Sequence, residues 1–447
     1  MALSGLEIFK LLPKTNCAEC GRPTCLAFAM ALAQKKASLE ECPHVSDAAK
    51  QALGAASAPP IKLVTIGIGP KALAVGEENV LFRHEEKFYH PAGVAVSVSD
   101  SLEEPALAER LSAANQLRFR RVGTDIQADL VEVRNDSGDP QRFAQAVAKA
   151  ACQVDLHLML SSANPDALKG ALSDGVAARR PLLGEATTEN WQAVAALAVE
   201  KKCPVAVRAD SLGVLADLTE KVKGAGVTEM VLDVTAGEPR QTLENLTRVR
   251  RLALRRTFRP LGFPTIARAP VGDPHNEMAW ASTFMAKYAS IVVTQSTDKA
   301  QVLALLTVRQ NIYTDPQKPV QVEPGLHPVG EPGPESPLMF TTNFSLTYYS
   351  VEGEVEASRV PAWILAVDTE GLSVLTAYSG DKLNEKVVHQ AMIKAGVEEK
   401  VKHRKLIIPG HVAVLSGKLE EETGWNIIVG PKEASQIPNY LQTQWKK

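Results

Sequence analysis

Four cysteines near the N-terminus have the spacing of a metal-binding segment. They follow the pattern Cys17-x2-Cys20-x4-Cys25-x16-Cys42, and they are four of the six cysteines in the chain. Four thiolates complete the ligand set of a [4Fe–4S] or [2Fe–2S] cluster. Structural zinc also takes four thiolates, but usually from two CxxC pairs, and only one such pair is present. The pattern favours an iron–sulfur cluster, with zinc and with redox or disulfide cysteines as the alternatives.

A short N-terminal segment, residues 1–57, must position these thiols. Two helices are expected in it, over Gly5–Leu12 and Leu26–Lys36, and the Ala-rich stretch Ala48–Pro60 is expected to be a linker. So short a segment buries too little apolar surface to be stable alone. A bound metal cluster would therefore contribute to its folding free energy.

Length and composition place the chain among ordinary globular proteins. Its 447 residues predict two or three domains, with 45% hydrophobic and 22% charged residues. A net charge of −2 without a Lys/Arg run gives no reason to expect nucleic acid as a partner. No apolar stretch approaches the ~20 residues of a membrane span, and the N-terminus lacks a secretory pattern. We expect a cytoplasmic protein in a reducing compartment.

The middle of the chain, residues 61–322, alternates short β-branched runs with amphipathic helices. About eight β/α units in about 260 residues match the size of a TIM barrel. A doubly wound sheet would show the same alternation, and length favours the barrel. The candidate strands are Lys62–Ile66, Val94–Val98, Asp125–Val133, Asp155–Leu160, Pro181–Leu183, Pro204–Val207, Glu229–Val234, Thr265–Ala267 and Ser290–Thr294.

After the proline-rich connection Pro319–Pro337, residues 338–447 repeat the β/α rhythm, and the last domain is expected to span residues 325–447. About four parallel strands with intervening helices predict a small Rossmann-like domain, whose ligand would bind beyond the C-terminal strand ends. The expected strands are Leu338–Thr342, Trp363–Val367, Lys405–Ile408 and Asn426–Val429.

Two weaker patterns carry little weight. Gly67 to Ala72 has the form G-x-G-x-x-A after a strand, but no clean helix follows it, so a barrel loop is favoured over dinucleotide binding. Segments starting at Asp155 and Asp273 match the Asp-x-His-x-x-Gly cobalamin motif only in part. No hydrolytic motif occurs, and we assign no catalytic residue.

Longer motifs resemble the large (gamma) subunit family of the corrinoid iron–sulfur protein, which serves CO dehydrogenase/acetyl-CoA synthase. They are Asn16–Ala29 with Cys42-Pro43, Thr341–Glu354, Asp368–Tyr378 and Val429–Ser435. The resemblance covers essentially the whole chain. It implies a [4Fe–4S] module at 1–57, a (β/α)8 barrel at 61–322 and a corrinoid-binding α/β domain at 325–447.

The family's function would make this chain a methyl carrier, a component of a corrinoid methyltransferase system. Co(I) of the corrinoid accepts a methyl group from methyltetrahydrofolate, through a separate methyltransferase, and donates it to acetyl-CoA synthase in the reductive acetyl-CoA pathway. The cluster returns inert Co(II) to the active state. A small subunit would form a heterodimer with this chain.

The resemblance also implies the site residues. The cluster ligands would be Cys17, Cys20, Cys25 and Cys42. The corrinoid contacts would be Thr342, Leu346, Glu370, Gly371, Leu372, Ser373 and Ala434. The lack of a complete cobalamin motif agrees with a family in which no protein histidine binds the cobalt.

The residues alone leave other functions open. The runner-up is an iron–sulfur electron-transfer or docking subunit without a corrinoid. A third hypothesis is a barrel that itself binds a pterin and catalyses methyl transfer, and a fourth is a zinc-stabilised scaffold.

Overall fold

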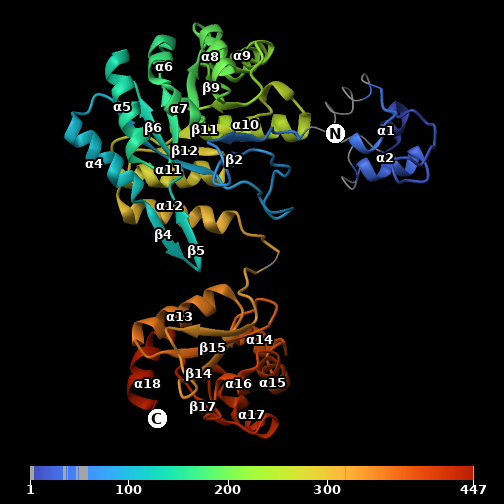
Figure 1. Ribbon diagram of the computed structural model, residues 1–447, viewed down its shortest axis with the longest axis vertical. Coiled ribbons are helices and arrows are strands. Elements are labelled where there is room, and N and C mark those ends of the chain that lie inside the picture. Colours follow the sequence, from blue (N-terminus) through green and yellow to red (C-terminus); the bar gives the residue numbers. More distant parts are fainter. Residues whose placement is uncertain are drawn as a thin grey trace. The chain divides into compact units, whose positions relative to one another are not determined.

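The computed structural model describes residues 5–33, 37, 39–46, 49, 59–317 and 319–445. The chain divides into two compact units. The first contains residues 1–118 and 127–313, and the second contains residues 119–126 and 314–447. Figure 1 shows the elements of both units in the colours of the sequence.

Two short helices form the N-terminal segment. Helix α1 spans Gly5–Leu11 and α2 spans Cys25–Ala33, so the helix expected from residue 5 is confirmed. Side chains of both helices form a small apolar core that includes Ile8 and Phe28. Residues 34–36 of the second expected helix, and most of the expected linker at 48–60, lie outside the described residues.

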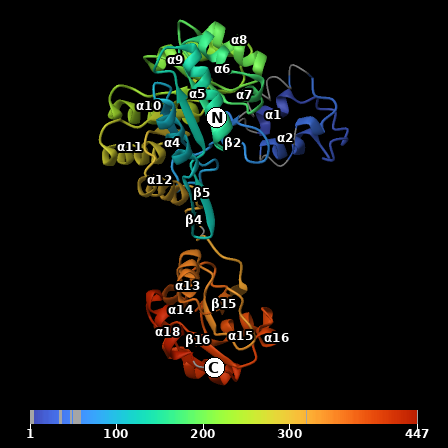
Figure 2. The same cartoon turned by 60° about the vertical axis from the view of Figure 1, so that its left-hand side comes forward.

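Eight parallel strands close into a barrel, as the sequence predicts, and nine helices lie between or after them (Figures 1 and 2). The strands pair in the order β10-β11-β12-β3-β6-β7-β8-β9. They are β3 (Gly93–Ser99), β6 (Leu130–Arg134), β7 (His157–Ser161), β8 (Leu182–Ala186), β9 (Val205–Arg208), β10 (Met230–Asp233), β11 (Thr265–Arg268) and β12 (Ile291–Thr294). The helices are α4 (Glu104–Asn115), α5 (Pro140–Gln153), α6 (Pro165–Ala171), α7 (Asp174–Ala178), α8 (Trp191–Lys201), α9 (Leu212–Gly224), α10 (Pro239–Arg256), α11 (Pro274–Ala286) and α12 (Lys299–Ile312).

The expected strand Lys62–Ile66 is not a barrel strand. Its residues Val64–Ile66 form β1, which pairs antiparallel with β2 (Leu73–Val75). Gly67 and Gly69 have φ of +86° and +75°, so the chain turns back where a barrel strand would lead into a helix. The G-x-G-x-x-A pattern is therefore the turn of a hairpin. The apolar side chains of this hairpin pack against residues at the inner, N-terminal end of the barrel.

The expected strand Asp125–Val133 is two separate strands. Thr124–Gln127 is β5, which forms a two-stranded sheet with β4 (Arg118–Arg121), and only Leu130–Arg134 enters the barrel. Positive φ values at Val122 and Gly123 make the tight turn between β4 and β5.

The second unit contains a five-stranded sheet between two layers of helices. Its order is β13-β15-β14-β16-β17, where β14 (Leu338–Thr342), β15 (Ala362–Val367), β16 (Lys405–Ile408) and β17 (Asn426–Val429) are parallel, as expected. One apolar cluster packs α13 (Ser345–Ser358) and α18 (Ile437–Gln444) on one face. Another packs α14 (Val374–Ser379), α15 (Glu385–Lys394), α16 (Val397–Lys400) and α17 (Ser416–Thr423) on the other. This arrangement is the α/β layer structure that the sequence predicts.

Strand β13 (Gly325–Val329) was not expected, because it lies inside the proline-rich connection. It pairs antiparallel with β15 at the edge of the sheet. An edge strand tolerates Pro328, which has no N–H to donate to a neighbour. The proposed boundaries at 57/61 and 322/325 stay predictions.

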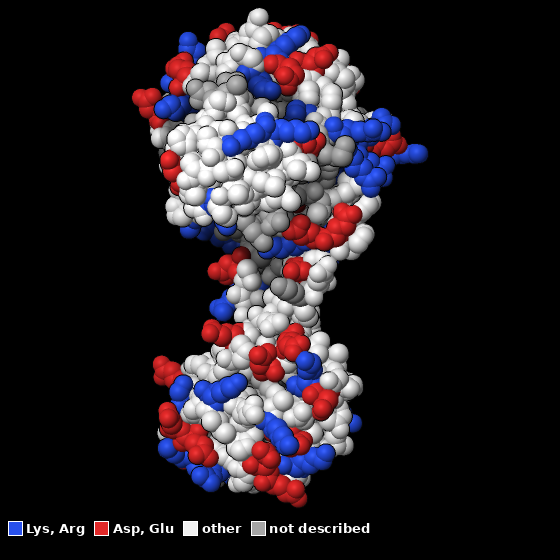
Figure 3. All heavy atoms as spheres, turned by 90° about the vertical axis from the view of Figure 1, so that its right-hand side faces the viewer, with Lys and Arg blue, Asp and Glu red and all other residues white. Residues whose placement is uncertain are grey.

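The described residues include no helix that is both long and apolar enough to cross a membrane. On the face shown in Figure 3, Lys and Arg side chains of the second unit are interspersed with Asp and Glu. This distribution agrees with the small net charge of −2.

Candidate functional site

The four N-terminal cysteines differ in their exposure to solvent. Cys17 is exposed, Cys20 is half-buried, and Cys25 and Cys42 are buried in the small apolar core. Cys25 begins helix α2, and Cys42 directly follows the 3-10 turn Leu39–Glu41. All four are free thiols, so the chain offers four sulfur ligands.

Asn16 holds the loop before the first cysteine against the start of α2. Its side-chain oxygen accepts a hydrogen bond from the backbone N–H of Cys25 at 2.8 Å, and its own backbone N–H donates to Cys25 Sγ at 3.4 Å. Asn16 and Ala18 have positive φ, and asparagine is one of the residues that adopts this conformation most readily. Hydrogen bonds to cysteine sulfur tune the reduction potential of a bound cluster. The sequence analysis missed Asn16, although its position directly before Cys17 was a signal.

The four cysteine sulfurs are not gathered as closely as the ligands of one zinc ion. Tetrahedral zinc with Zn–S bonds near 2.3 Å places its sulfurs about 3.8 Å apart. Within the described residues, no three of the four cysteine sulfurs lie within 4.8 Å of one another. The group that meets this distance is Cys17, Glu19 and His44, in which His44 pairs with Glu19 at 2.9 Å. A multi-iron cluster holds its thiolates farther apart than one ion does.

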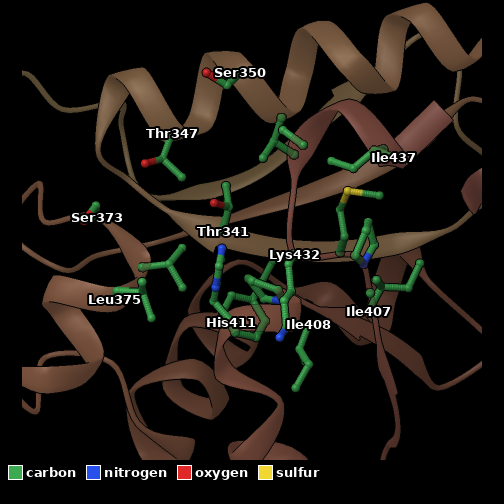
Figure 4. Close-up of a pocket in the computed structure, with 18 of the residues that line it drawn as sticks. Thr341, Thr347, Ser350, Ser373, Leu375, Ile407, Ile408, His411, Lys432 and Ile437 are labelled. Carbon is green, nitrogen blue, oxygen red and sulfur yellow. The ribbon is translucent and has the colours of Figure 1, made fainter.

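The second unit contains a cavity of about 420 Å³ at the C-terminal ends of its parallel strands. Strand β14 has β15 on one side and β16 on the other, so the strand order reverses beside β14. Open α/β sheets bind ligands at this reversal. Figure 4 shows His411 extending toward Thr341, with Thr347 on helix α13 facing the same space. Ser350 of the same helix also lines the cavity, and its hydroxyl donates to the Leu346 carbonyl at 2.6 Å.

Two glycines let the loops at the base of this cavity approach closely. A Cβ on Gly410 would lie 2.6 Å from the carbonyl oxygen of Gly430 and 2.9 Å from the backbone nitrogen of Lys432. A Cβ on Gly430 would lie 2.8 Å from Ile407 Cγ2. The Gly410 N–H donates to the Pro431 carbonyl at 3.0 Å. The loops after β16 and β17 are thereby fixed against each other.

The loop after β15 is organised by Asn343, a fully buried residue that the sequence analysis missed. Its side-chain oxygen accepts hydrogen bonds from the backbone N–H groups of Thr369 and Gly371 at 3.0 and 3.1 Å. Its amide nitrogen donates to Gln321 at 3.2 Å and to Asp368 at 3.3 Å. One asparagine thus fixes the backbone that leads to Ser373 in the cavity wall.

Asn343→Ala is expected to loosen this loop and to lower the free energy of unfolding of the second unit by about 3 kcal/mol. Buried N–H groups left without an acceptor cost about 1–3 kcal/mol each. Hydrogen–deuterium exchange should show faster exchange in residues 368–373. Asn384→Ala is the matched control: Asn384 caps helix α15 through the N–H of Val387, so its loss should cost about 1 kcal/mol and leave 368–373 protected. Unchanged exchange in the Asn343 variant would contradict the assignment.

The structure brings only some of the expected corrinoid contacts together. Leu346, Ser373 and Ala434 line the cavity. Thr342 is fully buried at the end of β14, and its hydroxyl has no hydrogen-bond partner. Glu370, Gly371 and Leu372 lie in the loop that Asn343 holds, and do not line the cavity; Glu370 pairs with Lys382 at 2.6 Å. As contacts to a corrinoid, all seven residues stay predictions.

The lining of the cavity is mostly apolar. Leu346 and Leu375 are each 50% exposed, and both line the cavity. Neighbouring apolar side chains that face solvent mark a surface that a ligand or partner covers. His411, Lys432, Ser350 and Tyr440 add polar groups to the lining.

A family model described as CO dehydrogenase/acetyl-CoA synthase delta subunit matches residues 63–441, and a model for an Fe-S cluster matches residues 12–44. The dihydropteroate synthase of Xanthomonas albilineans in complex with 7,8-dihydropteroate aligns at a TM-score of 0.37 and 15% identity, over 50% of this chain and 94% of that one. This likeness is too low to support an argument.

Full-length relatives agree with the family model. The corrinoid/iron-sulfur protein large subunit of Moorella thermoacetica is 49% identical over 98% of both chains. The acetyl-CoA decarbonylase/synthase complex subunit gamma of Methanothermobacter thermautotrophicus is 36% identical over 99% of both chains, and that of Archaeoglobus fulgidus is 37% identical over 99% of this chain and 98% of its own. This chain therefore belongs to the family of corrinoid/iron-sulfur protein large subunits and acetyl-CoA decarbonylase/synthase gamma subunits.

Proposed function

We propose that this chain carries a methyl group on a corrinoid bound in the 420 Å³ cavity of its C-terminal domain. When bound, the corrinoid would supply a cobalt able to take the methyl group of methyltetrahydrofolate and give it to acetyl-CoA synthase. A [4Fe–4S] cluster held by Cys17, Cys20, Cys25 and Cys42 would supply the one electron that returns Co(II) to Co(I). In this proposal the chain is the methyl-carrying component of a methyltransferase system.

The observation that carries this proposal is the cavity at the strand reversal. It is open to solvent at Leu346 and Leu375 and has loops held by Gly410 and Gly430. Apolar side chains would contact the face and edge of the ring, and Lys432 and His411 are placed to bind its polar substituents. The protein's part is to hold the ring, because the bond-making chemistry belongs to the cofactor.

The cysteine segment supports the second part of the proposal. Cys25 and Cys42 would hold the buried side of a cluster, while exposed Cys17 would keep its other side at the protein surface. A cluster placed in this way accepts electrons from an external donor. We propose domains at 1–57, 61–322 and 325–447 for cluster binding, the barrel and corrinoid binding.

The partners follow from the same chemistry. A methyltransferase must present methyltetrahydrofolate, and acetyl-CoA synthase must receive the methyl group. The name of the Moorella relative, a large subunit, supports a small subunit as the heterodimer partner.

Anaerobic absorption spectroscopy of the full chain reconstituted with iron, sulfide and a corrinoid tests the proposal. We expect sharp corrinoid bands that change on reduction, above a broad cluster absorption that bleaches. Adding methyltetrahydrofolate and its methyltransferase should transfer about one methyl group per chain, and omitting the methyltransferase is the control. If no corrinoid is retained, the proposal fails and an electron-transfer subunit is the better description.

A further inference from the structure

One group of metal-ligating side chains on the N-terminal segment is not explained by an iron–sulfur cluster. A thiol, a carboxylate and an imidazole, those of Cys17, Glu19 and His44, have ligand atoms that all lie within 4.8 Å of one another. Among the described residues, it is the one group of three such side chains with this spacing. All three residues are exposed, so an ion in solution can reach them. A four-thiolate cluster gives no role to the carboxylate or the imidazole.

The backbone brings the first two of these side chains together. Ala18, which lies between Cys17 and Glu19, has a φ of +62°, a conformation that residues other than glycine seldom adopt. The Ala18 carbonyl accepts a hydrogen bond from the Gly21 N–H at 2.9 Å, which closes a turn around Glu19. The two hydrogen bonds between Asn16 and the start of α2 fix the other side of this loop. The chain therefore holds the thiol and the carboxylate at one place without a metal.

The imidazole comes from a second segment, 25 positions further along the chain. His44 follows Cys42 and Pro43, and Cys42 is buried, with its N–H donating to the Leu39 carbonyl at 3.3 Å. The proline ring restricts φ at residue 43, so little backbone freedom remains between the buried cysteine and the histidine. His44 Nε2 lies 2.9 Å from Glu19 Oε2. Two separately anchored segments thus meet at these three side chains.

The donor atoms of this group select zinc among the common divalent ions. Thiolate sulfur, imidazole nitrogen and carboxylate oxygen are the three donor types that zinc uses in proteins. Magnesium and calcium instead prefer sites made only of oxygen. A thiolate and a carboxylate together carry a charge of −2, which balances that of one divalent ion. Three protein ligands leave one tetrahedral position for water, as in zinc sites that exchange their metal or bind a substrate.

Zinc at this place would compete with a cluster, because both need Cys17. Of the four cysteines Cys17 is the exposed one, whereas Cys25 and Cys42 are buried, so Cys17 is the thiol that an ion from solution meets first. Sites with nitrogen, oxygen and sulfur donors generally bind Zn²⁺ more tightly than Fe²⁺. A zinc ion on Cys17 would leave three thiolates for a cluster that takes four.

We propose that Cys17, Glu19 and His44 of the cluster-free chain form a zinc site with water as the fourth ligand, and that zinc bound there blocks assembly of the cluster. The zinc site itself does not depend on the proposed corrinoid function. The block of assembly rests on the part of the proposed function that makes Cys17 a cluster ligand. The two halves therefore need separate experiments.

Zinc titration of the full chain, freed of cluster and corrinoid and kept anaerobic and reduced, tests the site against a competing chromophoric chelator. We expect one zinc ion per chain. Glu19→Gln and His44→Gln should each weaken binding by at least about tenfold, since loss of even an outer partner at a metal site costs about 10–100-fold. Glu7→Gln, at an exposed carboxylate on α1 of the same segment, is the matched control and should bind normally. Circular dichroism shows whether each variant is folded.

Substitution of Co²⁺ for Zn²⁺ separates this site from one made by all four cysteines. The intensity of the thiolate-to-cobalt charge-transfer absorption, measured per bound ion, rises with the number of thiolates. We expect the intensity of a single thiolate, and we expect Cys17→Ala to abolish it. No zinc binding by the unmodified chain, the intensity of several thiolates, or normal zinc binding by folded Glu19→Gln would overturn the proposal.

Cluster reconstitution in the presence of zinc tests the second half. Increasing zinc should lower the yield of cluster absorption, and Glu19→Gln should need about tenfold more zinc for the same loss. Without zinc, both chains should take up the cluster equally. Equal sensitivity of the two chains to zinc would overturn the block of assembly. If neither chain takes up a cluster without zinc, the cluster assignment fails and the block fails with it, while the titration still decides the zinc site.

Discussion

Cys20→Ala is expected to slow reductive reactivation of the corrinoid by more than about 100-fold while methyl transfer from reduced cobalt proceeds at nearly its normal rate. Cys20 is one of four thiols, and loss of even an outer partner at a metal site costs about 10–100-fold in affinity or activity. The two rates separate because the cysteines are in the first unit and the cavity is in the second.

Both rates are measurable by stopped-flow absorption, one after adding a low-potential electron donor and one after chemical reduction to Co(I). Cys152→Ala is the matched control, since Cys152 is also accessible to solvent but lies in the last turn of barrel helix α5. Equal loss of both rates in Cys20→Ala would show that the cysteine segment has a structural role, and the electron-transfer assignment would fail.

Gly410→Ala is expected to weaken corrinoid binding by about tenfold to a hundredfold. The new methyl group would lie 2.6 Å from the Gly430 carbonyl oxygen, so the loops after β16 and β17 must separate at the base of the cavity. Overpacking of this kind costs about 1–3 kcal/mol, and 1.4 kcal/mol corresponds to tenfold in affinity.

Fluorescence or absorption titration of the corrinoid into the chain measures this effect. Gly417→Ala is the matched control: Gly417 lies in helix α17, and a Cβ there would have no neighbour within 4 Å. That variant should bind normally and be slightly more stable, because alanine favours a helix over glycine. Normal binding by Gly410→Ala would mean that the corrinoid does not occupy this cavity.

Local sequence patterns predicted most of the fold. Runs such as Val94–Val98 and Glu229–Val234 were recognised as barrel strands because buried parallel strands are almost continuously apolar. The two hairpins were missed because their turns depend on positive φ at Gly67 and Gly123, which sequence alone does not reveal. Strand β13 was missed because Pro328 is unfavourable in any strand except one at an edge.

The candidate sites were predictable to different degrees. The cysteines are close in sequence, and their spacing alone indicates a cluster. Asn343 acts through contacts with residues more than twenty positions away. The polar side chains inside the barrel, at the C-terminal ends of its strands, come one from each of several strands. Glu132 and Arg268, for example, form an ion pair although they are 136 positions apart. In the sequence, each of them is indistinguishable from an ordinary charged residue, because their pairing depends on the closed barrel.

The β1–β2 hairpin closes one end of the barrel to solvent. Val64, Ile66 and Val75 are fully buried against the inner residues of the barrel at its N-terminal end, so apolar side chains fill that end. Solvent reaches the polar side chains at the other end of the barrel, where the Arg208 side chain is 39% exposed. A molecule that binds inside the barrel would therefore enter and leave through its C-terminal end. A domain or partner that covers this end would slow its dissociation.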